Sequence, residues 1–378
     1  MKAKTLKLIV ICVVFLFIIN LSPIIIDKGE VIAEGWSAKS MVVIESQSGR
    51  VLYGKDYELK LPMASTTKIV TALTVLENCN DLSKEIQIDN RAVGIPGTSI
   101  YLKKGEILTI EELLYGMMLP SGNDAATALA YYVGGDIPTF CNMMAITARN
   151  AGAENSSFVN PHGLDECGHY TTALDLAKIT AKALQNNKFK KIVSTKSTRI
   201  RGSLPGTYRY LKNKNKLLNS LNGCIGVKTG YTDDAGRCLV SACERDFMSV
   251  CVVLNCGPMF EESEELLEKA YDNYSNVTIL PSYKLLRSIR VVDGKQDNVK
   301  VFTRREFKYP LTIDEAKRLE FRYNIPNVLN APVKKDEVIG ELEIYLDNNL
   351  LFFEKIYIMD NIQKIGVWSN IKDIISQW

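Results

Sequence analysis

Apolar and polar positions alternate along the chain in patterns that predict its main elements. A largely apolar segment at 69–76 follows Pro62 and a cluster of Ser and Thr residues, which is typical of the start of a buried helix. Residues 224–232 alternate as a strand does, and apolar runs at 238–243 and 249–254 follow at once. The short connection between these two runs predicts an antiparallel meander.

Beyond residue 276 the pattern changes from helical to strand-like. A charged helix is predicted at 261–274, and strands are predicted at 285–292, 299–303, 319–323, 338–346 and 350–359. Asp347, Asn348 and Asn349 favour a hairpin between the last two strands. In the tail, the apolar residues of 367–378 fall on one helical face, so the tail is predicted either to lie on a membrane or to pack against the strands before it.

The N-terminal residues follow the pattern of a secretory signal. Lys2, Lys4 and Lys7 precede an apolar run at 8–19, and Ala33 offers a cleavage position for residues 1–33. A further apolar run at 21–26 leaves an uncleaved anchor as the alternative. The length of 378 residues favours two or three domains, and the formal net charge of +3 gives no sign of a nucleic-acid partner.

The polar residues at the start of the first predicted helix are suited to nucleophilic chemistry. Ser65 and Lys68 are three residues apart, so on a helix they share one face and the amine can reach the hydroxyl. A helix N-terminus also favours the negative charge of an alkoxide. In isolation, Ser65 would be a helix cap and Lys68 a solvated lysine, and the second Ser-x-x-Lys, at Ser369, is read as accidental.

Two further segments supply groups that could act with this pair. Ser121 and Asn123 lie in a predicted turn before a helical segment at 125–130, where they could relay protons and orient Lys68. On the predicted strand, Lys228 and Thr229 could hold a carboxylate, and Gly230 would let a substrate backbone approach closely. Alone, each segment would be an ordinary turn or an exposed strand.

The order Ser-x-x-Lys, Ser-x-Asn and Lys-Thr-Gly is typical of penicillin-binding proteins and class A β-lactamases. With the segments 97–102, 113–125, 160–164, 168–175 and 226–232, it makes the chain resemble the low-molecular-mass penicillin-binding proteins, which are serine-type D-alanyl-D-alanine carboxypeptidases. The resemblance implies an α/β (α+β) catalytic domain of the penicillin-binding and β-lactamase-like class, with an antiparallel sheet, flanking helices and a helical lobe. It divides the chain into a signal peptide (1–33), a catalytic domain (34–276), a small β-rich domain (277–362) and an amphipathic tail (363–378).

The resemblance also implies a role for each motif residue. Ser65 would form the acyl-enzyme and Lys68 would be its general base, while the backbone N–H groups of Ser65 and Tyr231 would form the oxyanion hole. The remaining implied site residues are Ser121 and Asn123 for proton transfer, and Lys228, Thr229 and Gly230 for the substrate carboxylate. A lysine base must be neutral near pH 7, which requires burial and a neighbouring cation such as Lys228.

Other residue types add little to this picture. His162 and His169 are the only histidines; their spacing leaves a Ser-His-Asp triad open, whereas the resemblance makes both structural. The sequence contains neither zinc-ligand spacing nor a phosphate-binding glycine loop, so neither a metal nor a cofactor is expected. The eight cysteines that follow residue 33 are expected to be mostly free, buried thiols.

The resemblance implies an exported enzyme, secreted or peripheral on the outer face of the cytoplasmic membrane. It would trim the terminal D-alanine from peptidoglycan pentapeptide stems and be inhibited by β-lactams. A β-lactamase of related fold is one alternative, although the chain has no segment like the deacylating glutamate context of class A enzymes. A non-catalytic sensor that binds peptidoglycan or β-lactams is the other, and the intact motif set argues against it.

Overall fold

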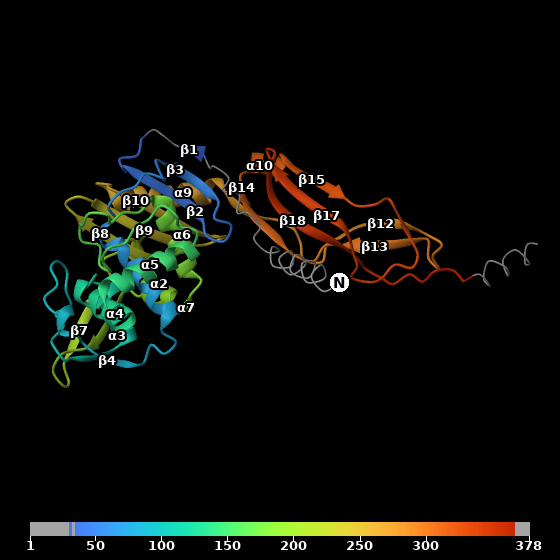
Figure 1. Cartoon of the computed structure of the whole chain (residues 1–378). Coiled ribbons are helices and arrows are strands. Elements are labelled where there is room, and N and C mark those ends of the chain that lie inside the picture. Colours follow the sequence, from blue (N-terminus) through green and yellow to red (C-terminus); the bar gives the residue numbers. More distant parts are fainter. Residues whose placement is uncertain (1–29, 32–34, 367–378) are drawn as a thin grey trace, which may run out of the picture.

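The structure is a computed structural model that describes residues 30–31 and 35–366. Its first part comprises β1 (Glu30–Val31), β2 (Ser40–Glu45), β3 (Val51–Lys55), η1 (Ala64–Thr67), α2 (Lys68–Asn78), β4 (Glu85–Gln87), η2 (Asn90–Ala92), β5 (Ile107–Thr109), α3 (Ile110–Met118), α4 (Asn123–Gly134), α5 (Ile137–Asn150), α6 (Ala173–Leu184), α7 (Asn187–Ser194), β6 (Ser197–Arg201), β7 (Tyr208–Lys212), α8 (Leu217–Ser220), β8 (Cys224–Thr232), β9 (Gly236–Glu244), β10 (Met248–Leu254) and α9 (Met259–Asn273). Its second part comprises β11 (Ser275–Leu280), β12 (Leu285–Val292), β13 (Asn298–Phe302), β14 (Phe307–Leu311), α10 (Ile313–Lys317), β15 (Leu319–Asn324), β16 (Val328–Asn330), β17 (Val338–Leu346) and β18 (Asn349–Ile358). The two parts lie side by side in Figure 1.

A six-stranded sheet in the order β1-β3-β2-β10-β9-β8 is the centre of the first part. Successive side chains of a strand point to opposite faces, so the sheet contributes to two cores. Val250 and Val252 of β10 pack with helices such as α2 and α6, whereas Cys251 and Val253 pack with α9 on the other face. In Figure 1 the helical lobe of α2 to α5 lies below the sheet. This layout confirms the predicted antiparallel sheet with flanking helices and a helical lobe.

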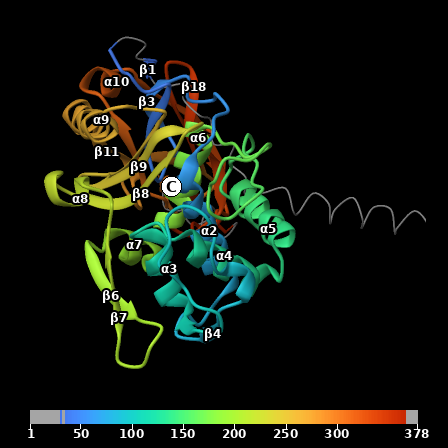
Figure 2. The same cartoon turned by 90° about the vertical axis from the view of Figure 1, so that its left-hand side faces the viewer.

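The meander β8-β9-β10 follows the prediction closely: β8 covers the alternating segment, and β9 and β10 contain the two apolar runs. Ser65 differs from the prediction: it lies in the short 3₁₀ turn η1, and the α-helix begins only at Lys68. The backbone at Ala64 has a positive φ of 49°, which does not continue into a regular α-helix. The sequence pattern did not indicate the hairpin β6–β7, which extends beside α3 in Figure 2.

The second part is β-rich, as predicted. Its main sheet has the order β15-β17-β18-β13-β12-β16, and β11 pairs separately with β14. Asp347 and Asn348 form the turn between β17 and β18 with φ values of 49° and 67°, which matches the two-residue hairpin turn expected from their residue types. Strand β11 begins at Ser275, two residues before the expected start of this domain at 277.

Arg50 joins the two parts through a buried guanidinium group. The group donates to the carbonyl oxygen of Pro310 and pairs with the carboxylate of Glu315, both in the second part. It also lies 5.2 Å from the ring centroid of Tyr274 and 5.0 Å from that of Tyr309. The contacts that Arg50 makes between the two parts are therefore polar and aromatic.

Two predictions concern segments outside the described residues. These are the signal peptide at 1–33, of which only residues 30–31 are described, and the amphipathic tail at 363–378, of which only residues 363–366 are described. Within the described part of the chain, no helix has the length and apolar character needed to cross a membrane.

Candidate active site

Ser65 and Lys68 meet at the junction of η1 and α2. The Nζ atom of Lys68 lies 2.8 Å from the Oγ of Ser65. The same nitrogen lies 2.7 Å from the Oδ1 of Asn123 and 2.7 Å from the backbone carbonyl oxygen of His162. The amide of Asn123 is held in turn, because its Nδ2 donates to the carbonyl of Pro96 over 2.6 Å.

Lys68 is fully buried, and its surroundings disfavour its charge. Burial is the main reason that the pKa of Lys68 lies well below its ordinary value, and the positive charges of Lys228 and Lys214 lower it further. Asp124 acts in the opposite direction. The required combination of burial and a neighbouring Lys228 is therefore present, with Lys214 as an additional cation.

A cleft of about 370 Å³ opens in front of this pair. Its lining combines residues of all three motifs: Ser65, Thr98, Ser121, Lys214, Thr229, Gly230, Tyr231, Met259 and Phe260. Lys228 is buried, and its Nζ donates to the carbonyl oxygen of Thr229 over 2.9 Å. Burial, with the nearby charge of Lys214, lowers the pKa of Lys228 to about 7. The cleft thus has the Ser65 hydroxyl and the Lys214 cation in its lining, and the amine of Lys68 lies within hydrogen-bond distance of that hydroxyl.

Gly230 has a different neighbour from the one that its sequence position suggested. A Cβ atom at Gly230 would lie 3.0 Å from both the Cβ of Ala64 and the backbone nitrogen of Ser65, and 3.1 Å from the carbonyl oxygen of Met63. The chain's own Ser65 turn therefore packs against β8 at this point. The close packing also brings the strand that carries Tyr231 next to the amide of Ser65.

Ser121 combines a strained backbone with an unpaired hydroxyl. Its φ of 76° is unusual for a residue with a side chain, and such strain is common at functional sites. The buried Oγ has no hydrogen-bond partner among the described residues, although Ser121 lines the cleft. Asp124 supports the neighbouring loop, because its carboxylate accepts from Ser99 and from the backbone of Ile100 and Leu102.

Both histidines have structural contacts. His162 contributes its backbone oxygen to Lys68, and the ring of His169 lies 2.8 Å from the Oγ1 of Thr67. Burial lowers the pKa of His162 to about 3 and that of His169 to about 4, so both rings are neutral near pH 7. Within the described part of the chain, neither ring hydrogen-bonds to Ser65.

Sequence analysis missed Lys214 and also Thr98, which lies opposite it. Lys214 reaches the cleft from the segment after β7, with its Nζ 3.4 Å from the Oγ1 of Thr98. The only signal for Lys214 is its place in an Asn-Lys-Asn segment, which carries no recognisable motif. The eight described cysteines are all free, and most are buried, in agreement with the prediction.

Comparisons with known proteins agree over nearly the whole described chain. A model of the D-alanyl-D-alanine carboxypeptidase family, peptidase S11, matches residues 29–257, and a model of the C-terminal domain of penicillin-binding protein 5 matches 274–364. The D-alanyl-D-alanine carboxypeptidase DacF of Bacillus subtilis is 29% identical over 90% of this chain and 90% of its own. DacC of Escherichia coli is 30% identical over 89% of this chain and 87% of its own.

Solved structures show the same fold. The D-alanyl-D-alanine carboxypeptidase DacD from Francisella tularensis matches with a TM-score of 0.68 and 25% identity, over 90% of this chain and 97% of that one. A mutant of the Streptomyces K15 DD-transpeptidase matches with a TM-score of 0.58 and 32% identity, over 63% of this chain and 97% of that one.

Proposed function

Since this chain belongs to the D-alanyl-D-alanine carboxypeptidase family, which are serine-type hydrolases, we propose that Ser65 is the nucleophile with which it removes the terminal D-alanine from peptidoglycan pentapeptide stems. The observation that carries this proposal is the 2.8 Å contact between the Ser65 Oγ and the Nζ of Lys68, a buried amine whose pKa lies well below its ordinary value. A nucleophile next to its base is the arrangement that covalent catalysis requires.

The reaction begins with attack of the Ser65 Oγ on the carbonyl carbon of the penultimate D-alanine. The hydroxyl proton passes to Lys68, and the oxygen of the carbonyl gains negative charge between the backbone N–H groups of Ser65 and Tyr231. Lys228 and Thr229 hold the terminal carboxylate beside Gly230. The Oγ of Ser121 relays a proton to the departing amine, and free D-alanine leaves.

Water then attacks the ester on Ser65 and gives a proton to Lys68, which passes it to the departing Oγ of Ser65. This restores the enzyme and releases the shortened stem. Asn123 keeps Lys68 aimed at the ester throughout, because its Oδ1 is within 2.7 Å of the amine. β-Lactams would acylate the same Ser65, since they mimic the acyl-D-Ala-D-Ala end. Because no step calls for electron transfer or a Lewis acid, the proposed route uses only side chains and backbone.

The wider setting is part of the proposal. Residues 1–33 direct export, and the enzyme acts outside the cytoplasm, secreted or on the outer face of the membrane. Residues 34–276 form the catalytic domain, and 277–362 form a spacer that sets its distance from the surface to which the tail at 363–378 attaches. The apolar face and two tryptophans of this tail support contact with a membrane surface.

The test is release of free D-alanine from diacyl-L-Lys-D-Ala-D-Ala by the chain without residues 1–33, beside Ser65→Ala. We expect release by the parent chain and at least a 10³-fold loss in the variant. A folded parent chain that releases no D-alanine would reject the proposal. Turnover of a β-lactam would then identify the β-lactamase alternative, and tight binding without turnover would identify the sensor.

A further inference from the structure

Positive charge is concentrated in one stretch of the chain. Between Asp175 and Asp233 there is no Asp or Glu, whereas 13 of the 46 Lys and Arg residues lie there. The formal net charge of the whole chain is only +3, so the remainder is acidic overall. The stretch includes the hairpin β6–β7, the segment 213–216 and the short helix α8.

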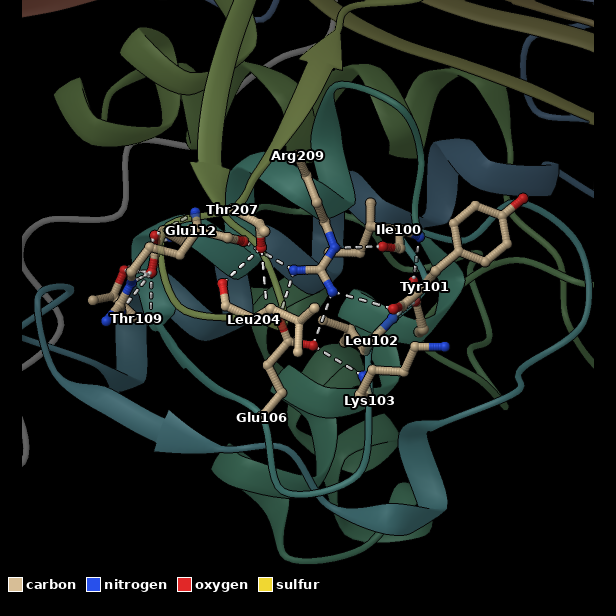
Figure 3. Close-up of polar contacts among 12 residues, drawn as sticks. Ile100, Tyr101, Leu102, Lys103, Glu106, Thr109, Glu112, Leu204, Thr207 and Arg209 are labelled. Atoms are coloured by element: carbon tan, nitrogen blue, oxygen red, sulfur yellow. Dashed lines mark hydrogen bonds and ion pairs between the residues drawn. The ribbon is translucent and has the colours of Figure 1, made fainter.

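Some of these cations are used to fix the hairpin on the helical lobe. Arg209 pairs with Glu106 and donates to the carbonyl oxygens of Ile100 and Tyr101 (Figure 3). Arg201 pairs with Glu112 and Glu85 in the same way. The hairpin is therefore a fixed part of the catalytic domain, and its remaining cations have defined positions.

A cavity of about 600 Å³ lies between the hairpin and α8. Its lining includes three cations, Lys196, Arg199 and Lys212, and none of its lining residues is acidic. Within the described part of the chain, none of these three cations forms an ion pair with a carboxylate. The ring of Tyr210, which is largely exposed, forms part of the same wall. The cavity is thus electropositive and has an aromatic side.

A buried side-chain amide at the wall of this cavity has a donor without a partner. Asn215 lines it and is only 1% exposed. Its backbone N–H donates to the Oδ1 of Asn213 over 3.0 Å, and its own Oδ1 accepts from the backbone of Leu217 over 3.1 Å, so the side chain is held in place. The Nδ2 has no hydrogen-bond partner among the described residues. A buried donor without an acceptor is unfavourable, and an oxygen of a bound ligand would satisfy it.

The cavity and the catalytic cleft share one wall. Asn213 and Asn215 line the cavity, whereas Lys214 between them lines the cleft with Ser65 and Thr229. A polymer bound in the cleft can therefore extend into the neighbouring cavity. A short peptide that fills only the cleft does not reach it.

We propose that this cavity is a second substrate site, which binds a carboxylate of a neighbouring stem peptide of the same peptidoglycan strand while the scissile stem occupies the cleft. The proposal rests on the proposed function for the identity of the polymer. A carboxylate accepts from the Nδ2 of Asn215 and pairs with Arg199 or Lys212 through charge-assisted hydrogen bonds. The exposed ring of Tyr210 suits the apolar face of a sugar. The site makes the enzyme prefer polymer to isolated peptides.

The test compares two double variants of the full chain in a Ser65→Ala background, by co-sedimentation with insoluble peptidoglycan. Arg199→Gln with Lys212→Gln removes the cavity charges, and Lys182→Gln with Lys188→Gln removes two charges elsewhere in the basic stretch. We expect the cavity pair alone to weaken binding by about threefold to tenfold at low salt, which is the range for two exposed ion pairs, and the difference to shrink at high salt. Asn215→Asp, which is nearly isosteric but introduces a carboxylate, should weaken binding at least as much.

Two controls separate the possible failures. With Ser65 intact, the double variant Arg199→Gln, Lys212→Gln should hydrolyse the short peptide diacyl-L-Lys-D-Ala-D-Ala at the parental rate. If the parent chain itself does not hydrolyse this peptide, the proposed function fails, and that result does not concern the cavity. Peptidoglycan whose carboxylates have been amidated should bind the parent chain as weakly as the cavity variant binds native material. Equal weakening by both double variants, or unchanged binding of amidated peptidoglycan, would overturn the inference. Preference for a phosphate-bearing polymer over peptidoglycan would overturn it too and assign the cavity to that polymer.

Discussion

Gly230→Ala tests whether the packing of β8 against the Ser65 turn sets the position of the nucleophile. The backbone of Gly230 does not have a positive φ, so alanine can adopt its conformation. Any effect must therefore come from the new methyl group. That group would meet the Cβ of Ala64, the nitrogen of Ser65 and the carbonyl oxygen of Met63 at 3.0 to 3.1 Å.

The size of the effect follows from what can move. All three contacts are tighter than ordinary van der Waals contact, and two of the three atoms belong to the backbone of a turn that is already constrained at Ala64. Since no flexible side chain can give way, β8 or the Ser65 turn must shift by a few tenths of an ångström. Overpacking of this kind costs about 1–3 kcal/mol of stability. A displacement approaching 1 Å between nucleophile and substrate would lower the rate by about 10²-fold.

The assay measures kcat and KM for D-alanine release together with urea unfolding. We expect a lower kcat for Gly230→Ala, by about tenfold to 10²-fold, with a smaller change in KM. Gly257→Ala is the matched control, because a Cβ at Gly257 meets no atom within 4 Å and should change neither property. If Gly230→Ala has parental stability and parental kcat, the packing argument is wrong and Gly230 serves another purpose.

Two further predictions concern charge. Burial lowers the pKa of Lys228 to about 7, and carboxylate binding needs its protonated form, so kcat/KM should fall as pH rises above about 7. Lys228→Arg should keep its charge and remove this decline. A pH profile of kcat/KM from 6 to 9 checks this, and a flat parental profile would contradict it. Arg50→Ala should lower the free energy of unfolding by about 1–3 kcal/mol, because it leaves Glu315 without its buried partner, while D-alanine release from a short peptide is retained. Urea unfolding beside Arg91→Ala, which breaks an exposed ion pair and should have no measurable effect, checks this, and equal stability of the two variants would refute it.

The features that the sequence revealed are those with a local pattern. The strands β8, β9 and β10 have alternating or unbroken apolar runs, and the motifs keep their order whatever the intervening loops. The β-rich nature of the second part was predictable for the same reason. These elements lie where expected because burial of one or both faces of a strand dictates its residue types directly.

Features that depend on distant contacts were not predictable. Lys214 enters the cleft because the hairpin β6–β7 is fixed by Arg209 and Glu106, and neither residue has a signature in the sequence. The role of Gly230 in packing against Ala64 depends on the meeting of two segments more than 160 residues apart in the sequence. A three-residue motif identifies the residues of a site but does not predict which of them contact residues of distant segments.

The contacts of Lys68 show how residues from distant segments surround the amine of the proposed base. A neutral amine has two N–H donors and one lone pair, whereas an ammonium group has three donors and no acceptor. Two of the three neighbours of Lys68 are pure acceptors, the Oδ1 of Asn123 and the carbonyl oxygen of His162, and the third is the hydroxyl of Ser65. In the neutral form, two bonds donated to these acceptors leave the lone pair for the Ser65 hydroxyl, whereas an ammonium group donates to all three neighbours. Burial and the neighbouring lysine charges lower the pKa of Lys68 and so favour this neutral form, in which the amine can accept the proton of Ser65.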